Sequence, residues 1–256
     1  MTTIAPATKN VIITGIKEAG NTILKYKGQS NIATKEKDFD YGIPADIISE
    51  KIILKAIKKT GIDCEIISEE SGTLGNEKSK LKIYIDSLDG TVNFSRSIPS
   101  FCIGLAIYEN KIPLLGIIYD PSNNELFIAE KNKGVTLNGK KIKPKYNSKK
   151  ILVNLEWFGA PEYDKVVKKL RKHKIRARTA GSGVLALCYS MIGRGDAAIL
   201  INNSPWDVAP GMVFAKEFGC IIKQLDGKEV DLNNKKIDLL AAPRPLFKKL
   251  FKIING

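Results

Sequence analysis

Apolar residues near the N-terminus recur at the spacing of one face of a helix. The series is Ile12, Ile16, Ala19 and Ile23. Steps of four, three and four residues match the α-helical period, so the pattern predicts an amphipathic helix over residues 7–27. A similar series predicts a second helix over residues 45–59. Lys58, Lys59 and Gly61 favour its end there, because basic residues and glycine are typical of helix C-termini.

Beyond residue 60 the apolar runs become short, as in β-strands. They are rich in β-branched and aromatic residues and are bounded by turn residues, which predicts five strands. The strands cover residues 65–68, 82–86, 101–108, 114–119 and 125–129. Asn138-Gly139 marks a tight turn after them.

The remaining sequence alternates between the two periods. Strands are predicted at residues 151–155, 197–201 and 237–242, and helices at residues 161–171, 184–192, 208–218 and 245–254. This alternation is typical of a layered α/β unit. The lysine-rich stretch 140–150, which contains Pro144, suggests a seam between an N-terminal α+β lobe (1–145) and a C-terminal α/β lobe (146–256). We expect one structural unit, because the acidic residues described below come from both lobes.

Composition indicates an ordinary globular protein. Hydrophobic residues make up 43% of the 256 residues and charged residues 27%, which is a usual balance. No apolar run reaches the 18 residues of a membrane span, and the N-terminus lacks the features of a secretory signal. The four cysteines are far apart within apolar segments, so we expect free buried thiols and a cytoplasmic location.

The formal net charge of +14 raises the question of an anionic partner. Lysines occur along the whole chain, and no basic stretch alternates with aromatic residues that would stack on bases. We therefore expect a solvated basic surface, with neither nucleic acid nor membrane as a partner. His173 is the only histidine and lies in the run RKHKIR, a solvated helix end. Catalysis by a Ser-His-Asp triad is accordingly not expected.

Three short segments concentrate the acidic residues that follow apolar runs. They are residues 66–72 (IISEESG), 83–94 (IYIDSLDGTVNF) and 205–209 (PWDVA). Acids at strand ends point toward the edge of a sheet where loops gather. So many carboxylates repel one another unless a cation lies between them. Oxygen ligands of this kind suit Mg²⁺ or Mn²⁺ rather than zinc.

The spacing in the second segment fits a metal and a phosphate together. Asp86 and Asp89 are separated by two residues, so a turn can bring both to one ion, with the Leu88 carbonyl as a further ligand. Gly90 allows a phosphate to approach the backbone closely, and Thr91 adds a hydroxyl and an amide. Alone, Asp-x-x-Asp-Gly-Thr is also an ordinary turn sequence. The other two acidic segments favour the metal site.

Together these segments resemble the signatures of the inositol monophosphatase family. The resemblance rests on Asp86 through Phe94, on Trp206 through Ala209 and on Ser68-Glu69-Glu70-Ser71, and it extends over most of the chain from Asp46 onward. It implies a layered αβαβα sandwich and a Mg²⁺-dependent phosphomonoesterase that acts through metal-activated water. Two or three Mg²⁺ per site are implied, with Mn²⁺ as a possible substitute, and a homodimer is expected from the family alone.

The resemblance also implies residue roles. The implied metal ligands are Glu69, Asp86, the Leu88 carbonyl, Asp89 and Asp207. The implied catalytic residues are Thr91, Asp46 and Glu69. The implied substrate contacts are Gly90, Thr91, Arg178, Gly181, Ser182, Gly183 and Asp207. The glycine-rich stretch 181–183 precedes a predicted helix whose free amides suit an anion, although a plain glycine turn that caps the helix is the alternative.

Some positions depart from the family pattern. Ser87 replaces a usual proline, which predicts a less rigid turn, and Ser68 replaces a usual glycine. Pro210 follows Ala209 in the predicted first turn of a helix, where proline is tolerated. Leu200 stands where inositol-specific animal enzymes have an acid that contacts inositol.

These departures bear on the substrate. With Leu200 in place of the acid, we expect hydrolysis of both inositol-1-phosphate and fructose-1,6-bisphosphate, with Arg178 and Lys35 or Lys37 accommodating a second phosphate. A strictly single-substrate inositol monophosphatase, in which Asn202 or Asn203 replaces the missing acid, is one alternative. A non-catalytic RNA-binding or regulatory protein is the other.

Overall fold

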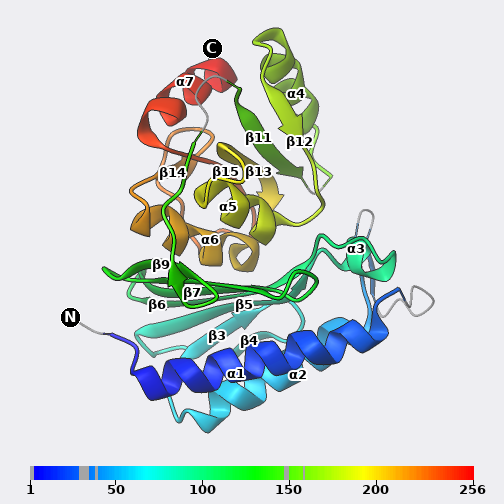
Figure 1. Ribbon diagram of the computed structural model, residues 1–256, viewed down its shortest axis with the longest axis vertical. Helices are drawn as coiled ribbons and strands as arrows, with labels where there is room; N and C mark the ends of the chain where they lie inside the picture. Colours follow the sequence, from blue (N-terminus) through cyan, green and yellow to red (C-terminus); the bar gives the residue numbers. More distant parts are fainter. Residues whose placement is uncertain (1–2, 29–34, 38–39, 147–149, 158) are drawn as a thin grey trace.

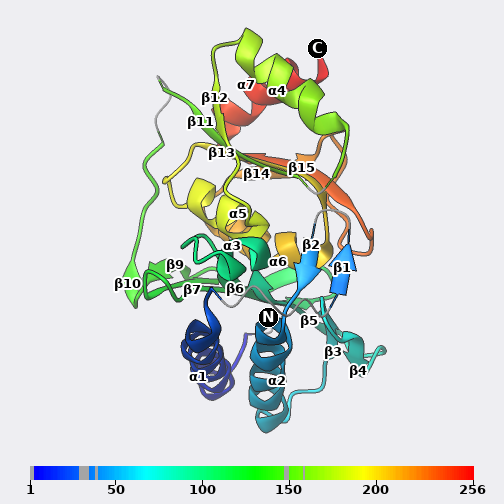
Figure 2. The same cartoon turned by 90° about the vertical axis from the view of Figure 1, so that its right-hand side faces the viewer.

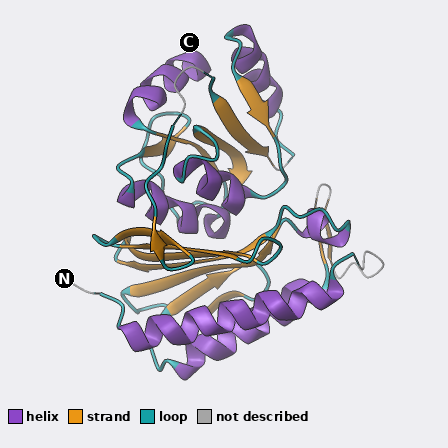
Figure 3. Ribbon diagram, viewed as in Figure 1, coloured by secondary structure: helices purple, strands orange, loops and turns teal. Residues whose placement is uncertain are grey.

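The computed structural model describes residues 3–28, 35–37, 40–146, 150–157 and 159–256. These residues form five stacked layers in the order helices, sheet, helices, sheet, helices (Figure 1). The alternation of helical and strand layers is equally clear when the chain is coloured by secondary structure (Figure 3). The predicted αβαβα sandwich is therefore confirmed. None of the helices among the described residues combines the length and the apolar character that crossing a membrane requires.

The first outer layer consists of α1 (Pro6–Ile23), which continues into a 3-10 turn at Leu24–Tyr26, and α2 (Pro44–Lys59). Both helices begin with proline, which fits the first helical turn because no intrahelical partner awaits its missing N–H. They approach closely at Gly15, where an added Cβ would lie 2.3 Å from the Cβ of Ala56. Both predicted helices are confirmed. Along the chain, a short hairpin of β1 (Lys35–Lys37) and β2 (Asp40–Gly42) separates the two helices.

The first sheet has eight strands in the order β10-β9-β8-β7-β6-β5-β3-β4. The strands are β3 (Glu65–Ser68), β4 (Gly72–Gly75), β5 (Leu81–Asp89), β6 (Cys102–Glu109), β7 (Ile112–Asp120), β8 (Glu125–Glu130), β9 (Gly134–Leu137) and β10 (Lys140–Lys141). All five predicted strands are present. The three that were not predicted, β4, β9 and β10, are short and mostly lack the apolar alternation on which strand prediction depends.

The second sheet has five strands in the order β12-β11-β13-β15-β14. They are β11 (Leu152–Trp157), β12 (Arg176–Arg178), β13 (Ala197–Asn203), β14 (Ile221–Gln224) and β15 (Ile237–Ala242). Helices α5 (Gly183–Met191) and α6 (Pro205–Glu217) lie between the two sheets. Helices α4 (Glu162–Lys172) and α7 (Arg244–Asn255) cover the far face (Figure 2). The division into lobes at 145/146 stays a prediction.

The middle helical layer shares one apolar core with both sheets. Side chains such as Tyr108 from β6, Leu187 from α5 and Leu239 from β15 belong to this single buried cluster. Such burial on both faces explains why α5 shows almost no polar side. The four cysteines are free, as predicted. Cys64, Cys102 and Cys188 are buried, whereas Cys220 is only partly buried.

The start of α6 differs from the prediction. The helix begins at Pro205 rather than near residue 208, so Pro210 lies inside it, beyond the first turn. Two features fix the earlier start. Pro205 occupies the first helical position, and the Ser204 N–H donates to Asp207 Oδ2 at 2.7 Å. At Gly104 of β6 an added Cβ would lie 3.2 Å from Pro210 Cγ, so the proline ring packs directly on the first sheet.

Candidate active site

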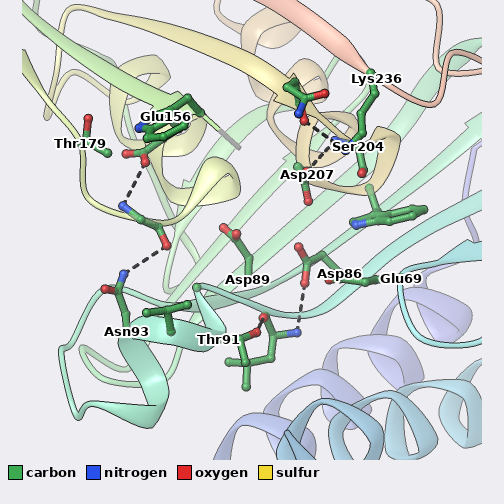
Figure 4. A pocket seen from close by; sticks show the side chains of 17 residues that line it. Glu69, Asp86, Asp89, Thr91, Asn93, Glu156, Thr179, Ser204, Asp207 and Lys236 are labelled. Atoms are coloured by element: carbon green, nitrogen blue, oxygen red, sulfur yellow. Dashed lines mark hydrogen bonds between the residues drawn. The ribbon is translucent and has the colours of Figure 1, made fainter. Parts of the chain in front are cut away.

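Strand β5 carries a bulge that brings two aspartates to the same side. Asp86 is paired with Gly104 of β6 and Asp89 with Cys102, so three steps along β5 oppose two along β6. In a regular strand, residues three apart point to opposite faces. The extra residue re-aims the side chain, which is a known effect of a bulge. Figure 4 shows both carboxylates directed into one cavity.

Asp207, from the C-terminal half of the chain, lies beside these two aspartates. Carboxylate oxygens of Asp86, Asp89 and Asp207 all lie within 4.8 Å of one another, and all three residues are buried. Asp207 is the third residue of α6, where its Oδ2 accepts the Ser204 N–H. Helix α6 packs directly on β5. The packing of the middle layer against the first sheet therefore completes the cluster.

Burial raises the pKa of each carboxyl in this cluster, and repulsion from neighbouring carboxylates adds to the rise at Asp86 and Asp207. Burial, followed by the charges of Glu69, Asp89 and Asp207, raises the pKa of Asp86 well above its usual range. Burial raises the pKa of Asp207 to about 7, with Asp89 as the next cause. Asp89 rises less, to a pKa of about 6, because donors at the start of α5 oppose the effect of burial. A cation in the cluster would offset this cost, so the all-oxygen donor set fits Mg²⁺.

Glu69 and Thr91 also line the cavity of about 500 Å³ that contains the cluster. Glu69 follows β3, the parallel neighbour of β5. The hydroxyl oxygen of Thr91 lies 3.0 Å from the Leu88 carbonyl oxygen and 3.1 Å from Asp46 Oδ1. Asp46 is buried behind Thr91 and is not among the residues that line the cavity. Its other oxygen accepts the Ile43 N–H at 2.5 Å, at the start of α2.

Gly90 and Gly181 both line the cavity and have positive φ angles, +89° and +74°. An added Cβ at Gly90 would lie 2.7 Å from the Ser100 carbonyl oxygen, so only glycine fits there. The side-chain nitrogen of Asn93 lies 2.7 Å from the Ala180 carbonyl oxygen and thereby ties the two glycine loops together.

Ser182 and Gly183 lie behind Asp89 rather than on the cavity wall. The buried Ser182 hydroxyl donates to Asp89 Oδ2, and the N–H groups of Gly183 and Val184 donate to the same carboxylate at 3.2 and 2.8 Å. The structure therefore places the expected anion-binding amides of α5 on a protein carboxylate instead of on a substrate. This favourable position at a helix N-terminus explains why the pKa of Asp89 rises less than that of Asp207.

Arg178 also lies outside the cavity lining. Its side chain is exposed at the end of β12, and its Nη2 lies 3.3 Å from Asn154 Oδ1. The predicted substrate contacts thus divide into two groups. Gly90, Thr91, Gly181 and Asp207 line the cavity, whereas Arg178, Ser182 and Gly183 do not. The side chains of Lys35 and Lys37 lie outside the described residues.

The cavity lining also includes residues that the sequence analysis missed, among them Glu156, Trp157 and Lys236, whereas Asn202 was named there only as part of an alternative. Glu156 is at the end of β11, the kind of position that singled out Glu69 and Asp86. Its carboxylate accepts the N–H groups of Ala180 and Gly181 at 2.7 and 3.0 Å, and burial raises its pKa to about 7. The expectation that an acid at the end of a strand points toward the site, applied to the second half of the chain, would have identified Glu156.

A second bulge determines which asparagine faces the cavity. The pairing of β13 with β15 shifts register between Leu200 and Asn203, and Asn202 has φ of +62°. Asn202 consequently lines the cavity, whereas Asn203 is fully buried and bonds to the Ile201 carbonyl at 3.1 Å. Leu200 belongs to the core between the sheets. Lys236 reaches the same part of the cavity, where its Nζ lies 3.4 Å from the Asn202 carbonyl oxygen.

The serines that depart from the family pattern are both held by α2. Ser87 donates to the Asp46 carbonyl at 3.1 Å and accepts, through its own carbonyl, from the Ser49 hydroxyl at 2.6 Å. The turn predicted to be less rigid is thus fixed by hydrogen bonds. Ser68 donates to Glu50, a buried acid that sequence reasoning also missed. These bonds connect α2 to both segments that carry the candidate metal ligands of the first sheet.

Known proteins share this sequence and fold. A "Nus factor SuhB" of Xylella fastidiosa is 33% identical over 235 residues, 87% of this chain and 84% of that protein. A "fructose-1,6-bisphosphatase" of Pyrococcus furiosus is 32% identical over 197 residues, 76% of this chain and 74% of that protein. The solved inositol monophosphatase of Thermotoga maritima has a TM-score of 0.84 and 27% identity, with 95% of this chain and 94% of that chain covered. The model of the inositol monophosphatase family matches residues 7–254, and the chain therefore belongs to that family.

Proposed function

We propose that this protein is a Mg²⁺-dependent phosphomonoesterase that hydrolyses both inositol-1-phosphate and fructose-1,6-bisphosphate. The observation that supports it most is the set of three buried carboxylates, with oxygens within 4.8 Å, that opens onto a cavity of about 500 Å³. Three such charges destabilise the fold unless a cation neutralises them. A protein that only bound a partner elsewhere would have no use for this cluster.

In this proposal Glu69, Asp86, the Leu88 carbonyl, Asp89 and Asp207 hold two or three Mg²⁺, and Mn²⁺ is the natural substitute. When bound, the ions supply charge stabilisation for the phosphoryl oxygens and acidify water. The backbone at Gly90 and Thr91 receives the phosphate, since the missing side chain at Gly90 permits close approach. Stabilising the charge on the phosphoryl group is the main catalytic task in such reactions.

Thr91 and Asp46 are suited to take the proton of the attacking water. Thr91 donates its hydroxyl hydrogen to Asp46 Oδ1 at 3.1 Å, which leaves the hydroxyl oxygen to accept a hydrogen from water. As Thr91 accepts a hydrogen from water, it passes its own hydroxyl hydrogen to the Asp46 carboxylate. The proton therefore ends on Asp46, which does not need to face the cavity itself. Glu69 faces the cavity directly and offers a second acceptor.

The substrate groups beyond the phosphate face a mixed surface. Glu156, Asn202 and Trp157 present acceptors, donors and an apolar face that suit hydroxyl-bearing carbon. Lys236 adds a cation where a second phosphate can be accommodated. Because Leu200 is buried in the core, no acid reaches inositol from that position, and discrimination against other polyols is relaxed.

Two alternatives have specific support. Glu156 can accept hydrogen bonds from substrate hydroxyls in place of the acid that Leu200 replaces. This favours a strictly single-substrate inositol monophosphatase. Relatives named "Nus factor SuhB" favour a regulatory binding role. A homodimer and a cytoplasmic location stay predictions.

Kinetics with a panel of phosphomonoesters test the proposal. The chelated protein should release no phosphate, and Mg²⁺ added alone should restore release from both named substrates. Equal activity in EDTA would refute the metal mechanism. A preference for inositol-1-phosphate above about a thousandfold, roughly 4 kcal/mol, would establish the single-substrate alternative.

A further inference from the structure

The excess positive charge of this protein is concentrated in two short segments. Residues 162–178 and 244–256 together contain twelve Lys or Arg and two Asp or Glu. These thirty residues carry a net charge of +10, compared with +14 for the whole chain. Lysines do occur along the whole chain, but elsewhere acidic residues nearly balance them.

The fold places both segments on one outer face. Helices α4 and α7 contact each other and cover the second sheet, at the opposite end of the molecule from α1 and α2 (Figures 1 and 2). Lys169 Nζ donates to the Ile254 carbonyl at 2.5 Å and links the two helices. Their apolar sides, which include Leu170 and Leu250, belong to the core beneath them. We call this surface of α4, α7 and β12 the basic face.

The basic side chains of this face are available to a partner. Eleven of them are exposed: Lys165, Lys168, Arg171, Lys172, Lys174, Arg176, Arg178, Arg244, Lys248, Lys249 and Lys252. Across the described residues, the salt bridges involve other lysines and arginines. Self-repulsion on this face is therefore unrelieved by the protein and favours binding of a polyanion.

The lack of large exposed apolar side chains on the basic face indicates which kind of polyanion it binds. The large exposed apolar side chains of the described chain are Tyr26, Leu74, Ile98 and Ile112, none of which belongs to α4, α7 or β12. A helix that lies in a membrane surface needs apolar side chains to insert. Stacking on unpaired bases needs exposed aromatic rings, whereas Phe247 and Phe251 stack on each other. Regularly spaced lysines and arginines alone suit the phosphates of a double helix.

In place of the purely solvated surface expected from the sequence, we propose that the basic face binds the phosphate backbone of double-helical nucleic acid without reading its sequence. The 11-residue α4 spans roughly 16 Å, enough to meet several phosphates along one groove edge. This binding is separate from the candidate active site and does not depend on the proposed phosphatase activity.

Charge-neutralising variants test the proposal. The variant Lys168→Gln/Lys172→Gln/Lys249→Gln removes three charges from the basic face. The matched control, Lys51→Gln/Lys55→Gln/Lys59→Gln, removes three exposed lysines from α2, on the opposite outer layer. Both variants have the same net charge, and glutamine is a good helix former. Binding is measured by fluorescence anisotropy with RNA and DNA duplexes of about 20 base pairs, over a series of salt concentrations.

We expect both duplexes to bind. The basic-face variant should bind at least about tenfold more weakly, with a salt slope lower by about 2 to 3, and the control within about twofold of wild type. Inositol-1-phosphate hydrolysis should be the same in all three proteins. Equal weakening by the two variants, or no binding by the wild type, would overturn the proposal. So would a strong sequence preference, or basic-face-dependent binding of phosphatidylserine vesicles in place of the duplexes.

Discussion

Ser182 donates its hydroxyl hydrogen to Asp89 Oδ2 across 93 positions of the sequence. The bond joins the first residue before α5 to the end of β5, and both partners are buried. Two backbone donors at the start of α5 hold the same carboxylate. The position of Asp89 is therefore set by a helix of the middle layer as much as by its own strand.

Removal of this bond should weaken metal binding without unfolding the protein. In Ser182→Ala, the two backbone donors still hold Asp89, so we expect Mg²⁺ to bind about 10- to 100-fold more weakly, as for other residues that orient a metal ligand. The measurement is phosphate release as a function of Mg²⁺ concentration. Ser190→Ala removes a buried serine from the same helix, where its hydroxyl bonds to Asn154 and Ala197, and serves as the control. An equal shift of the Mg²⁺ requirement in both variants would show that the Ser182 bond has no special role.

Neutralisation of one cluster carboxylate should abolish most activity. We expect Asp89→Asn and Asp207→Asn each to lower kcat by at least about a hundredfold, the scale on which one well-placed electrostatic group acts. The metal-free fold should survive, because each change relieves repulsion among buried charges. Turnover with saturating Mg²⁺ and circular dichroism of the metal-free proteins check both statements. Asp226→Asn, at an exposed position, is the control, and wild-type turnover in either cluster variant would refute the ligand assignment.

The metal-free protein should lose stability as pH rises. The pKa of Asp207 is raised to about 7 and that of Glu156 to about 7, above the values of the unfolded chain. Between about pH 4 and pH 7 the folded state therefore binds more protons than the unfolded state, and the free energy of unfolding falls with increasing pH. We expect a loss on the order of a few kcal/mol between pH 5 and pH 8.

Thermal or urea unfolding in EDTA at the two pH values measures this loss. Saturating Mg²⁺ should restore stability at pH 8, because the ligand carboxylates are then ionised and paired. If the metal-free protein were equally stable at both pH values, the cluster would not carry the repulsion inferred from its geometry. Asp207→Asn should reduce the pH dependence.

Lys236 should distinguish a bisphosphate from a monophosphate. We expect Lys236→Met to lower kcat/KM for fructose-1,6-bisphosphate by about tenfold, near 1.4 kcal/mol, and to change that for inositol-1-phosphate by less than about threefold. The reason is that Lys236 lines the cavity, where its charge has more effect than on the open surface. Lys235→Met alters the exposed neighbouring lysine, which does not line the cavity, and is the control. Equal losses for both substrates would indicate that Lys236 acts on the transferred phosphate instead.

Much of this protein is determined by its sequence alone. The helical spacing near Ile12 and Ile16, and the short apolar runs that follow α2, predict the main helices and strands because local burial periodicity is a property of consecutive residues. The chemistry of Asp86, Asp89 and Thr91 is likewise visible, since these residues lie within one short segment whose donor types suit a hard cation. Glu69 and Asp207 were recognised by their motifs.

Only the tertiary structure decided how those residues and their partners meet. The bulge between Asp86 and Asp89 depends on the partner strand β6, and the bond from Ser182 to Asp89 depends on α5 lying between the two sheets. The cavity positions of Asn202 and Lys236, and the side-by-side packing of α4 with α7, arise in the same way. Each is a contact between residues distant in the chain, which packing of the layers selects and which no local pattern encodes.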